Sequence, residues 1–538
     1  MKPVIIAKID SLFSDCKKPG FPGYALGIVD NGKIVYKRGY GMANLEHDIP
    51  ISTKSVFDIG STSKQFVAFC IAILEKKGRL SLDEPVQKYM PEMSLYKHPV
   101  TIRHLIHHTS GIRDYLTLMD LAGMRYENEY PEDEIIGLIA KQRDLNFKPG
   151  SEFLYCNSGY LLLGEIVKRV AGRSLREFAE DNIFSPLGMK NTHFHDSFSL
   201  IVKNRAAGYS VGPDGVKADV SIFDAVGDGG VNTTVEDLFF WDQNFYYNKL
   251  AGGGQKLIEK VTATGHLNNG LELNYAHGLF LGTYRGLKTI THGGAWIGYR
   301  TEIVRFPQKN FSVICLSNFS QATPARIAWQ ISDIYLGGEM TGIPLRPALK
   351  RESRASVNKR KKLTGIYLNT ESGDFLEITI EGGNLFSTSG GGNYMLEPSG
   401  PHHYTVTGGA FEIKFRDGGG KSPGTALLKA RTGREEAYEK IILPAVSEKR
   451  ALACAGRYYS EELDIEYSII PEKGQLFLVR KNAKREELRM LQGDLFSADC
   501  LSLRFFGERA GRRVGFKLGA GRVKGLLFYR VGRTVVLR

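Results

Sequence analysis

The sequence predicts a multidomain protein in which a mixed α+β region is followed by two small all-β barrels. Three observations lead to this expectation. The chain has 538 residues, and at roughly 100 to 200 residues per domain this length predicts two to four domains. Helical and strand patterns alternate up to about residue 345, whereas the remainder reads as short strands separated by Gly-rich turns. That remainder also contains an internal repeat.

The repeat covers most of the chain after residue 362. Gly365–Tyr367 matches Gly456–Tyr458, and Gly383–Phe386 matches Gly474–Phe477, in each case at an offset of 91 positions. A pattern that recurs at a fixed spacing indicates copies of one structural unit. Short strands with Gly-rich turns suggest that each copy is a small antiparallel barrel. The expected division is a first domain at 1–345, a basic linker at 346–362, and barrels at 363–445 and 446–538.

Composition favours a soluble globular protein and argues against several classes. The chain is 42% hydrophobic and 24% charged, and no segment approaches the roughly 18 uninterrupted apolar residues of a membrane span. The six cysteines form no Cys-x-x-Cys pair, so buried, reduced thiols are expected rather than disulfides or a zinc site. Residues 351–538 hold 32 Lys and Arg against 22 Asp and Glu. Because these charges alternate with strand-forming residues, solvated strand faces are favoured over nucleic-acid binding.

The N-terminus bears on where the protein resides. Residues Met1–Asp10 have too short an apolar core and too early a charge for a signal peptide, and they predict an amphipathic helix. The expected location is the cytoplasm. If a leader has been removed from this sequence, a periplasmic or secreted protein is the alternative.

Several elements of the first region can be assigned from local patterns. Ala25–Tyr36 consists of two β runs around Asn31-Gly32, which is a strong hairpin signal. Thr301–Phe306 and Ser312–Asn318 predict two antiparallel strands, and Ala325–Leu336 predicts a helix that closes the region.

Thr101–His108 predicts a helix capped by Thr101. His104, His107 and His108 have the i, i+3, i+4 spacing of metal ligands on such a helix. No carboxylate or cysteine accompanies them, so structural histidines are favoured over a metal site.

The stretch Phe57–Phe66 carries the first candidate site. Gly60 interrupts the preceding pattern, and apolar residues then recur at helical spacing, so Ser61 is expected on the first turn of a buried helix. The N–H groups at a helix start favour developing negative charge. Lys64 projects from the same face as Ser61, and an amine beside a hydroxyl can activate serine without a Ser-His-Asp triad. Since Ser-x-x-Lys occurs three more times in the chain, an ordinary capping serine with a surface lysine is the alternative.

A second stretch delivers Tyr155 and Asn157 just before an apolar helix. A turn at Pro149-Gly150 precedes them, and an extended backbone would place both side chains on one side. A phenol beside the Lys64 ammonium would ionise more easily and could act as general base, while the amide offers donors to a substrate. A buried tyrosine followed by a turn-forming asparagine is the alternative.

A third stretch is a β run that ends in His292, Gly293 and Gly294. Paired glycines after a strand allow another backbone to approach closely, as when a substrate lies along a sheet edge. The N–H of the next residue, Ala295, could complete an oxyanion hole together with the N–H of Ser61.

With these stretches in one order, residues 20–336 resemble the penicillin-recognising serine hydrolases. That family includes class C β-lactamases, D,D-peptidases, D-aminopeptidases and related esterases. Its signatures Ser-x-x-Lys, Tyr-x-Asn and Lys/His-x-Gly match Ser61/Lys64, Tyr155/Asn157 and His292/Gly294. The resemblance implies an antiparallel sheet flanked by helices with an all-helical lobe, and an acyl-enzyme mechanism without metal or organic cofactor. The site residues that it implies are catalytic Ser61, Lys64 and Tyr155, and substrate-binding Asn157, His292, Gly293, Gly294 and Ala295.

One position departs from the usual pattern of the family. His292 stands where penicillin-binding proteins and most β-lactamases carry lysine, and an imidazole is largely neutral at pH 7. Recognition of a substrate carboxylate is therefore in doubt. The His-x-Gly form, together with two barrels after the hydrolase domain, resembles the bacterial D-aminopeptidases.

The resemblance implies a small peptide, amide or ester substrate, with β-lactams as acylating ligands. A homodimer is left open, and no nucleic acid is expected as a partner. The alternatives are a carboxylesterase of small acyl esters, a weak β-lactamase or penicillin-binding protein, and a non-catalytic peptide sensor or scaffold. Gly-rich barrel loops at 390–393, 418–420 and 492–494 could reach the site, where Asp494 would bind a substrate amine; a solvated hairpin tip is the alternative for each.

Overall fold

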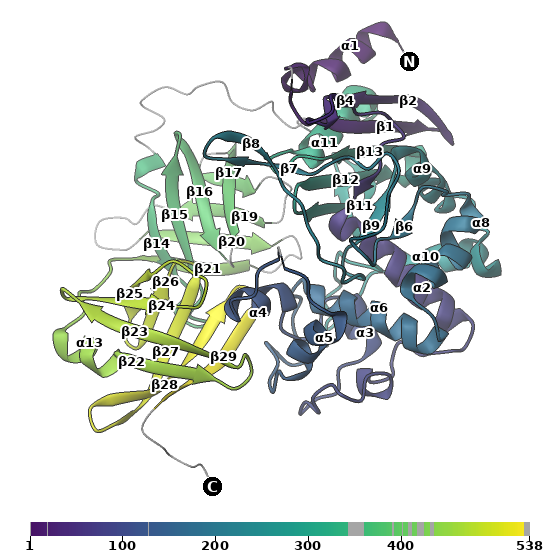
Figure 1. Ribbon diagram of the computed structural model, residues 1–538. Coiled ribbons are helices and arrows are strands. Elements are labelled where there is room, and N and C mark those ends of the chain that lie inside the picture. Colours follow the sequence, from purple (N-terminus) through teal and green to yellow (C-terminus); the bar gives the residue numbers. More distant parts are fainter. Residues whose placement is uncertain are drawn as a thin grey trace. The chain divides into compact units, whose positions relative to one another are not determined.

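A computed structural model of the chain describes residues 2–18, 20–126, 128–342, 360–389, 392–400, 402–406, 411–416, 424–430 and 435–531. The chain divides into two compact units (Figure 1). Unit 1 comprises Met1–Gly111, Tyr126–Gly137 and Phe147–Pro347. Unit 2 comprises Ile112–Arg125, Leu138–Asn146 and Ala348–Arg538. Two segments from the first third of the sequence therefore group with the barrels.

Unit 1 is built on a six-stranded antiparallel sheet with strand order β10-β11-β12-β13-β1-β2. In β1 five consecutive residues are buried, because helices cover both faces of the sheet. Helices α1 and α11 pack on one face, and α9 packs on β1 and β13. The strands are β10 (Phe280–Tyr284), β11 (Leu287–Trp296), β12 (Tyr299–Phe306), β13 (Phe311–Ser317), β1 (Tyr24–Asp30) and β2 (Lys33–Tyr40).

The remainder of unit 1 is a helical lobe with three small sheets. The helices of the unit are α1 (Pro3–Ser11), α2 (Lys64–Lys76), α3 (Ile102–Ile106), α5 (Glu132–Ala140), α6 (Asn157–Ala171), α7 (Leu175–Ala179), α8 (Ser185–Leu187), α9 (Val235–Asn244), α10 (Gly254–Val261) and α11 (Pro324–Leu336). The division between the units falls within α5. The small sheets pair β3 (Met42–Asn44) with β4 (Ile49–Pro50), β5 (Phe57–Asp58) and β6 (His193–Phe194) with β9 (Val231–Thr233), and β7 (Tyr209–Gly212) with β8 (Gly215–Ala218).

The local predictions for this unit are confirmed. The first hairpin turns at Asn31 and Gly32, with φ of 49° and 76°, which is the left-handed pair that a tight two-residue turn requires. In α3 the Thr101 side chain accepts from the His104 N–H and the His104 side chain accepts from the Thr101 N–H, so the predicted cap is a full capping box.

Unit 2 contains two closed eight-stranded antiparallel barrels. The first consists of β14 (Gly365–Leu368), β15 (Phe375–Glu381), β16 (Asn384–Ser389), β17 (Gly392–Gly400), β18 (His403–Val406), β19 (Phe411–Arg416), β20 (Thr425–Ala430) and β21 (Glu435–Ile441). The second consists of β22 (Gly456–Ser460), β23 (Ile465–Glu472), β24 (Gln475–Val479), β25 (Glu486–Gln492), β26 (Leu495–Ala498), β27 (Leu501–Arg509), β28 (Arg512–Ala520) and β29 (Val523–Arg530). The predicted fold class, an α+β domain followed by two barrels, is confirmed. The short helix α13 (Glu448–Cys454) between the barrels was not predicted.

The repeated Gly-x-Tyr motif occupies the same place in both barrels. It opens β14 in the first and β22 in the second. Tyr367 donates its hydroxyl to the Leu363 carbonyl at 2.9 Å, and Tyr458 donates to the Cys454 carbonyl at 2.7 Å. Each tyrosine therefore ties the first strand of its barrel to the carbonyl four residues earlier. The two copies of the sequence repeat therefore make the same hydrogen bond in their barrels.

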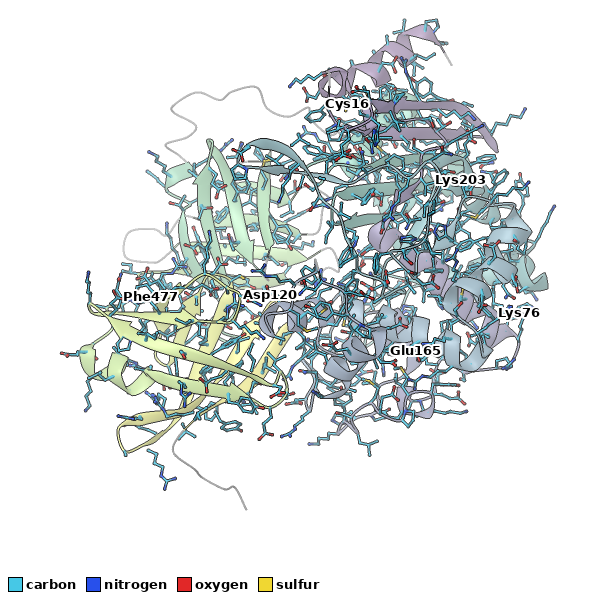
Figure 2. All side chains as sticks on the ribbon, viewed as in Figure 1. Cys16, Lys76, Asp120, Glu165, Lys203 and Phe477 are labelled. Atoms are coloured by element: carbon cyan, nitrogen blue, oxygen red, sulfur yellow. The ribbon has the colours of Figure 1, made fainter. Side chains whose placement is uncertain are left out.

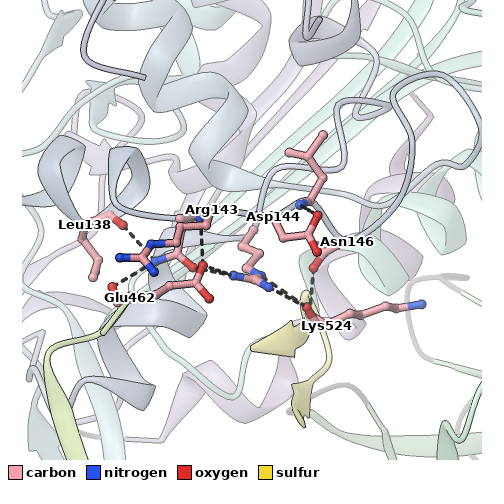
Figure 3. A network of polar contacts seen from close by, with 9 residues as sticks. Leu138, Arg143, Asp144, Asn146, Glu462 and Lys524 are labelled. Atoms are coloured by element: carbon pink, nitrogen blue, oxygen red, sulfur yellow. Dashed lines mark hydrogen bonds and ion pairs between the residues drawn. The ribbon is translucent and has the colours of Figure 1, made fainter. Parts of the chain in front are cut away.

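Segments from the first third of the sequence are held on the second barrel. Arg113 is 1% exposed and pairs with Glu462 at 2.6 Å, and its guanidinium also donates to the Lys524 carbonyl. Asn146 donates to the Arg522 carbonyl and accepts from the Lys524 N–H. Figure 3 shows this network from close by. It binds loop residues around position 113 and positions 142–146 to the hairpin of β28 and β29.

Helix α4 (Tyr115–Leu121) is attached to the same barrel. Tyr467 donates its hydroxyl to the Leu121 carbonyl at 2.6 Å. Asp120, labelled in Figure 2, lies 3.5 Å from Arg480. Because these contacts join residues more than 340 positions apart, unit 2 combines segments from the first third of the sequence with its C-terminal region.

Asp494 does not fit the role suggested for it in substrate binding. Its Oδ1 accepts from Arg450 and, at 2.7 Å, from Arg513, so the carboxylate is already neutralised within unit 2. Side chains in the loops at 390–393 and 418–420, and nearly all of the predicted linker at 346–362, lie outside the described residues.

The cysteines agree with the prediction of unpaired thiols. All six are free, five are buried and Cys500 is half-buried. Within the described residues, no helix combines the length and hydrophobicity that a membrane span needs.

Candidate active site

Two glycines bring Ser61 against strand β11. Gly60 has φ of 49°, and a Cβ on it would lie 2.8 Å from the Ala295 nitrogen. A Cβ on Gly294 would lie 1.8 Å from the Ile59 carbonyl oxygen. Any side chain at either position would push the turn and the strand apart. The turn that carries Ser61, Gly60–Ser63, therefore lies directly on the backbone of Ala295.

Lys64 is the centre of the polar contacts around Ser61. Its side chain is 0% exposed, and Nζ donates to Ser61 Oγ at 3.1 Å, to Asn157 Oδ1 at 3.0 Å and to the Asp228 carbonyl at 2.6 Å. All three acceptors are neutral groups. Ser61 itself is half-buried, so the structure places the hydroxyl of a half-buried serine in contact with a buried amine.

Tyr155 lies beside the same amine. Lys64 Nζ is 5.0 Å from the centroid of the Tyr155 ring, a distance at which a cation and an aromatic face attract. The Tyr155 ring also packs against His108, with ring centroids 4.2 Å apart. Ser61, Lys64, Tyr155 and Asn157 therefore converge in unit 1.

His108 fixes the loop that delivers Tyr155 and Asn157. It is 1% exposed with φ of 56°, which is unusual for a residue with a side chain. Its Nδ1 accepts from the Cys156 N–H at 3.0 Å, and its carbonyl accepts from the Leu154 N–H at 2.9 Å. Cys156 is extended (φ −136°, ψ 118°), so Tyr155 and Asn157 share one side, as expected. Asn157 is the first residue of α6 rather than a loop residue.

His292 is held through both ring nitrogens. Nδ1 lies 2.7 Å from the Gly293 carbonyl, and Nε2 lies 3.2 Å from the Tyr275 hydroxyl. Because a carbonyl oxygen only accepts, Nδ1 carries a proton. Complete burial raises the pKa of Tyr275 well above 10, so the group at Nε2 is a neutral, protonated hydroxyl. No carboxylate is among these contacts of the His292 ring.

Two contributors to the site were not singled out from the sequence. Tyr275 was missed, although Gly278, three residues further on, indicates a close approach of this segment to another backbone. Gly278 has φ of 70°, and a Cβ on it would lie 2.5 Å from the Gln65 nitrogen, so this segment packs on the start of α2. The Asp228 carbonyl was also missed, since a backbone acceptor leaves no residue-type signature.

The three histidines of the α3 region do not converge on one point. His104 completes the capping box, His107 Nδ1 lies 3.3 Å from the Tyr275 carbonyl, and His108 contacts Cys156. Within the described ranges, no group of three or more His, Cys, Asp or Glu residues is placed to hold a metal ion.

Buried histidines in this unit should make the fold sensitive to acid. Desolvation lowers the pKa of His107 to about 4 and that of His277, 5.5 Å away between ring centroids, well below 6.5. Both are neutral in the folded state, whereas the unfolded chain binds protons at these positions below about pH 6.5. The free energy of unfolding is therefore expected to fall as pH drops from 6.5 towards 4, by about 3 kcal/mol at pH 4 for His107 alone.

Urea unfolding at pH 7.5 and pH 5.0 checks this expectation. His277→Gln should reduce the pH dependence, while His47→Gln, at an exposed position, should leave it unchanged. An equal pH dependence in both variants and the parent would contradict the assignment.

Comparison with known proteins places the chain in a family. Residues 9–335 match the family model described as Beta-lactamase. Penicillin-binding protein 4* of Bacillus subtilis (strain 168) is 29% identical over 417 residues, which cover 74% of this chain and 91% of that protein. A D-aminopeptidase of Cereibacter sphaeroides is 26% identical over 461 residues, which cover 84% of this chain and 82% of the relative.

Solved structures show the same fold. A penicillin-binding protein homologue from Pyrococcus abyssi, described as octameric, covers 89% of this chain and 99% of its own, with 23% identity and a TM-score of 0.56. A D-stereospecific amidohydrolase from Streptomyces sp. covers 62% of this chain and 98% of its own, with 21% identity and a TM-score of 0.51. On the match over residues 9–335 and the Ser61–Lys64 arrangement, the chain belongs to the β-lactamase family and is a serine hydrolase.

Proposed function

We propose that this protein hydrolyses the amide bond that follows an N-terminal D-amino acid in small peptides or amides. The observation that carries the proposal is the Lys64 amine, which hydrogen-bonds Ser61 and Asn157 at 3.1 Å and 3.0 Å. The match to a D-aminopeptidase covers 84% of this chain, more than residues 1–345 alone can supply, which supports this substrate class over a family member that lacks the barrels.

The proposed mechanism assigns one role to each group. Ser61 Oγ attacks the substrate carbonyl, and its proton passes to the Lys64 and Tyr155 pair. The N–H groups of Ser61 and Ala295, brought together by the contact of Gly60 with β11, hold the oxyanion. Collapse of the tetrahedral intermediate expels the amine, which takes up the proton. Water then attacks the acyl-enzyme and loses a proton to the same pair. Collapse of this second tetrahedral intermediate breaks the bond to Ser61 Oγ, which takes up that proton, and the acid is released.

The Lys64 hydrogen bond also orients the side chain of Asn157. Because Oδ1 accepts from Nζ, the amide nitrogen points away from Lys64 and is the end that would donate to a substrate carbonyl. We propose that Asn157 and the backbone of Gly293 to Ala295 line the substrate.

Position 292 is expected to set the preference against carboxylates. His292→Lys should increase acylation by penicillins or D-Ala-D-Ala peptides relative to a neutral D-alanyl amide. A partly desolvated charge pair is worth on the order of 1 to 3 kcal/mol, or roughly ten- to hundredfold in this ratio. The ratio of acylation rates, measured on a variant with the parent's unfolding midpoint, checks the expectation. An unchanged ratio would mean that selectivity lies elsewhere.

The proposal has two further parts, which concern acylation by β-lactams and self-association. β-Lactams would acylate the same Ser61, and labelling with a fluorescent penicillin tests this. A homodimer in solution remains a prediction that light scattering can test.

A rate panel tests the proposed function. It compares D-alanine p-nitroanilide, its N-acetyl form, a D-Ala-D-Ala peptide, nitrocefin and p-nitrophenyl butyrate, each with the parent and with Ser61→Ala. The free D-alanyl amide should be the best amide substrate, and the variant should not turn it over. Turnover of the ester alone would favour a carboxylesterase. A protein that neither turns over any substrate nor is labelled by a fluorophosphonate would favour a sensor.

A further inference from the structure

The turn that carries Ser61 is held at both ends by hydrogen bonds from other elements. The Ile59 N–H donates to the Val231 carbonyl at 3.0 Å, and the Ile59 carbonyl accepts from Thr301 Oγ1 at 2.9 Å. Ser63 Oγ accepts from the Val231 N–H at 3.0 Å. These contacts hold the residues on either side of Gly60 and Ser61 and the carbonyl end of the Ile59–Gly60 peptide, but they do not bind the N–H end of that peptide.

That peptide is held by Asp58. Asp58 Oδ1 accepts from the Gly60 N–H at 2.7 Å, at the residue whose φ of 49° turns the chain towards β11. Its backbone is fixed in turn, since β5 pairs Asp58 with Asn232 of β9. A short charge-assisted bond of this kind is roughly twice as strong as one between neutral groups. We infer that Asp58 is a positioning residue that holds the Gly60 turn, and with it the hydroxyl and N–H of Ser61, in the reactive geometry.

The inference rests on the proposed role of Ser61 but extends to a residue outside the three signatures. Asp58 does not contact the reacting groups in the mechanism; it acts through Gly60. If the turn relaxed, Ser61 Oγ and the Ser61 N–H would both move relative to Ala295. Displacement of reacting groups by about 1 Å can cost on the order of a hundredfold in rate.

The surroundings of Asp58 make this bond dependent on pH. Asp58 is 8% exposed, and its pKa is raised to about 6, chiefly by burial and to a smaller extent by Asp228, while the Gly60 N–H and Arg205 act to lower it. Tyr299 is a further neighbour, whose pKa Asp58 raises, and Arg205 itself contacts His195 at 3.1 Å. Protonation leaves a weaker, neutral acceptor for the Gly60 N–H. Reactivity of Ser61 should therefore decline, by no more than about threefold, as pH falls through about 6.

Two substitutions separate the acceptor from the charge. Asp58→Asn keeps a side-chain oxygen at the same place but cannot titrate, whereas Asp58→Ala removes the acceptor. The readout is the second-order rate of Ser61 labelling by a fluorophosphonate between pH 5 and 8.5, because labelling needs only a reactive serine. Hydrolysis of D-alanine p-nitroanilide by the same samples gives kcat and KM. Labelling without amide turnover would refute the proposed function, and the labelling rates of the variants would still test the role of Asp58.

The expected result at pH 8 is a loss of about ten- to hundredfold in labelling rate and kcat for Asp58→Ala, with KM within about threefold. Asp58→Asn should stay within about threefold of the parent. Asp58→Asn should also lack the decline in labelling rate near pH 6 that the parent shows. Thr301→Val is the matched control, since it removes a non-titrating bond to the same turn and should lower the rate without changing the pH profile.

Unfolding midpoints identify any variant that fails to fold, and the fraction labelled is referred to folded protein. An Asp58→Ala protein with the parent's labelling rate and pH profile would overturn the inference. So would an Asp58→Asn protein as impaired as Asp58→Ala at pH 8, because the charge and not the acceptor would then be what matters.

Discussion

Replacing Lys64 with methionine is expected to lower kcat/KM for an amide substrate by on the order of a thousandfold, the range in which a positioned acid–base group contributes. Methionine has a similar length but removes the three hydrogen bonds that Nζ donates to Ser61, Asn157 and Asp228. The pair of Lys64 and Tyr155 that takes the serine proton would be broken, and the Asn157 amide would lose the hydrogen bond that orients it. Steady-state kinetics with D-alanine p-nitroanilide measure the loss.

The matched control lies on the same helix. Lys76, at the last turn of α2 and labelled in Figure 2, is exposed, and Lys76→Met should leave kcat/KM within about twofold, as expected of a surface position. If Lys64→Met kept more than a tenth of the parent's activity while folded, the amine would not be the group that activates Ser61.

Replacing Glu462 with alanine is expected to destabilise unit 2 by about 3 to 5 kcal/mol, because it leaves the Arg113 charge buried without its carboxylate. Arg113 is 1% exposed and Glu462 6% exposed. Glu462 Oε2 also accepts from the Arg143 N–H at 2.8 Å, so the substitution leaves a backbone donor unpaired as well. Urea unfolding, followed by far-UV circular dichroism, measures the change in the free energy of unfolding.

The neighbouring residue supplies the control for this prediction. Glu461 pairs with Arg143 at 2.7 Å, but both side chains are more than half exposed. Glu461→Ala should therefore change the free energy of unfolding by less than about 1 kcal/mol. Equal effects of the two substitutions would mean that the buried pair adds nothing beyond a surface ion pair.

The Arg113–Glu462 pair affects what can be expected of a chain that ends near position 345. The sequence predicts a domain boundary near residue 345, since linker composition and the repeat both place one there. In the structure, Ile112–Arg125 and Leu138–Asn146 belong to unit 2. A chain ending near position 345 would leave Arg113 and α4 without the barrel that binds them, so loss of activity on truncation would not identify the barrels as a specificity element.

Most of the fold could be predicted because its signals are local. Hairpin turns at Asn31-Gly32, apolar helical spacing after Ser61 and the 91-residue repeat each depend on a few neighbouring residues. The assignment of α4 to the second barrel could not be predicted. It depends on Arg113 meeting Glu462 across 349 positions, and no local pattern reports such a pairing.

The site follows the same division. Ser61, Lys64, Tyr155, Asn157 and His292 carry their chemistry in their side chains and could be recognised from spacing. Contributors that act through the backbone or through geometry were missed. They are the Asp228 carbonyl, which accepts from Lys64, the Tyr275 hydroxyl, which contacts His292, and the Asp58 carboxylate, which accepts from the Gly60 N–H. Their roles become visible only when distances are known.

The most direct test of the mechanism is to trap the acyl-enzyme and locate it. The protein is mixed with a slowly hydrolysed D-alanyl ester or a fluorophosphonate, quenched in acid and digested, and the modified peptide is sequenced by mass spectrometry. The mechanism predicts one adduct, on Ser61, that is absent from Ser61→Ala together with amide turnover. An adduct on another residue, or a Ser61→Ala protein that hydrolyses D-alanine p-nitroanilide at the parent's rate, would contradict it.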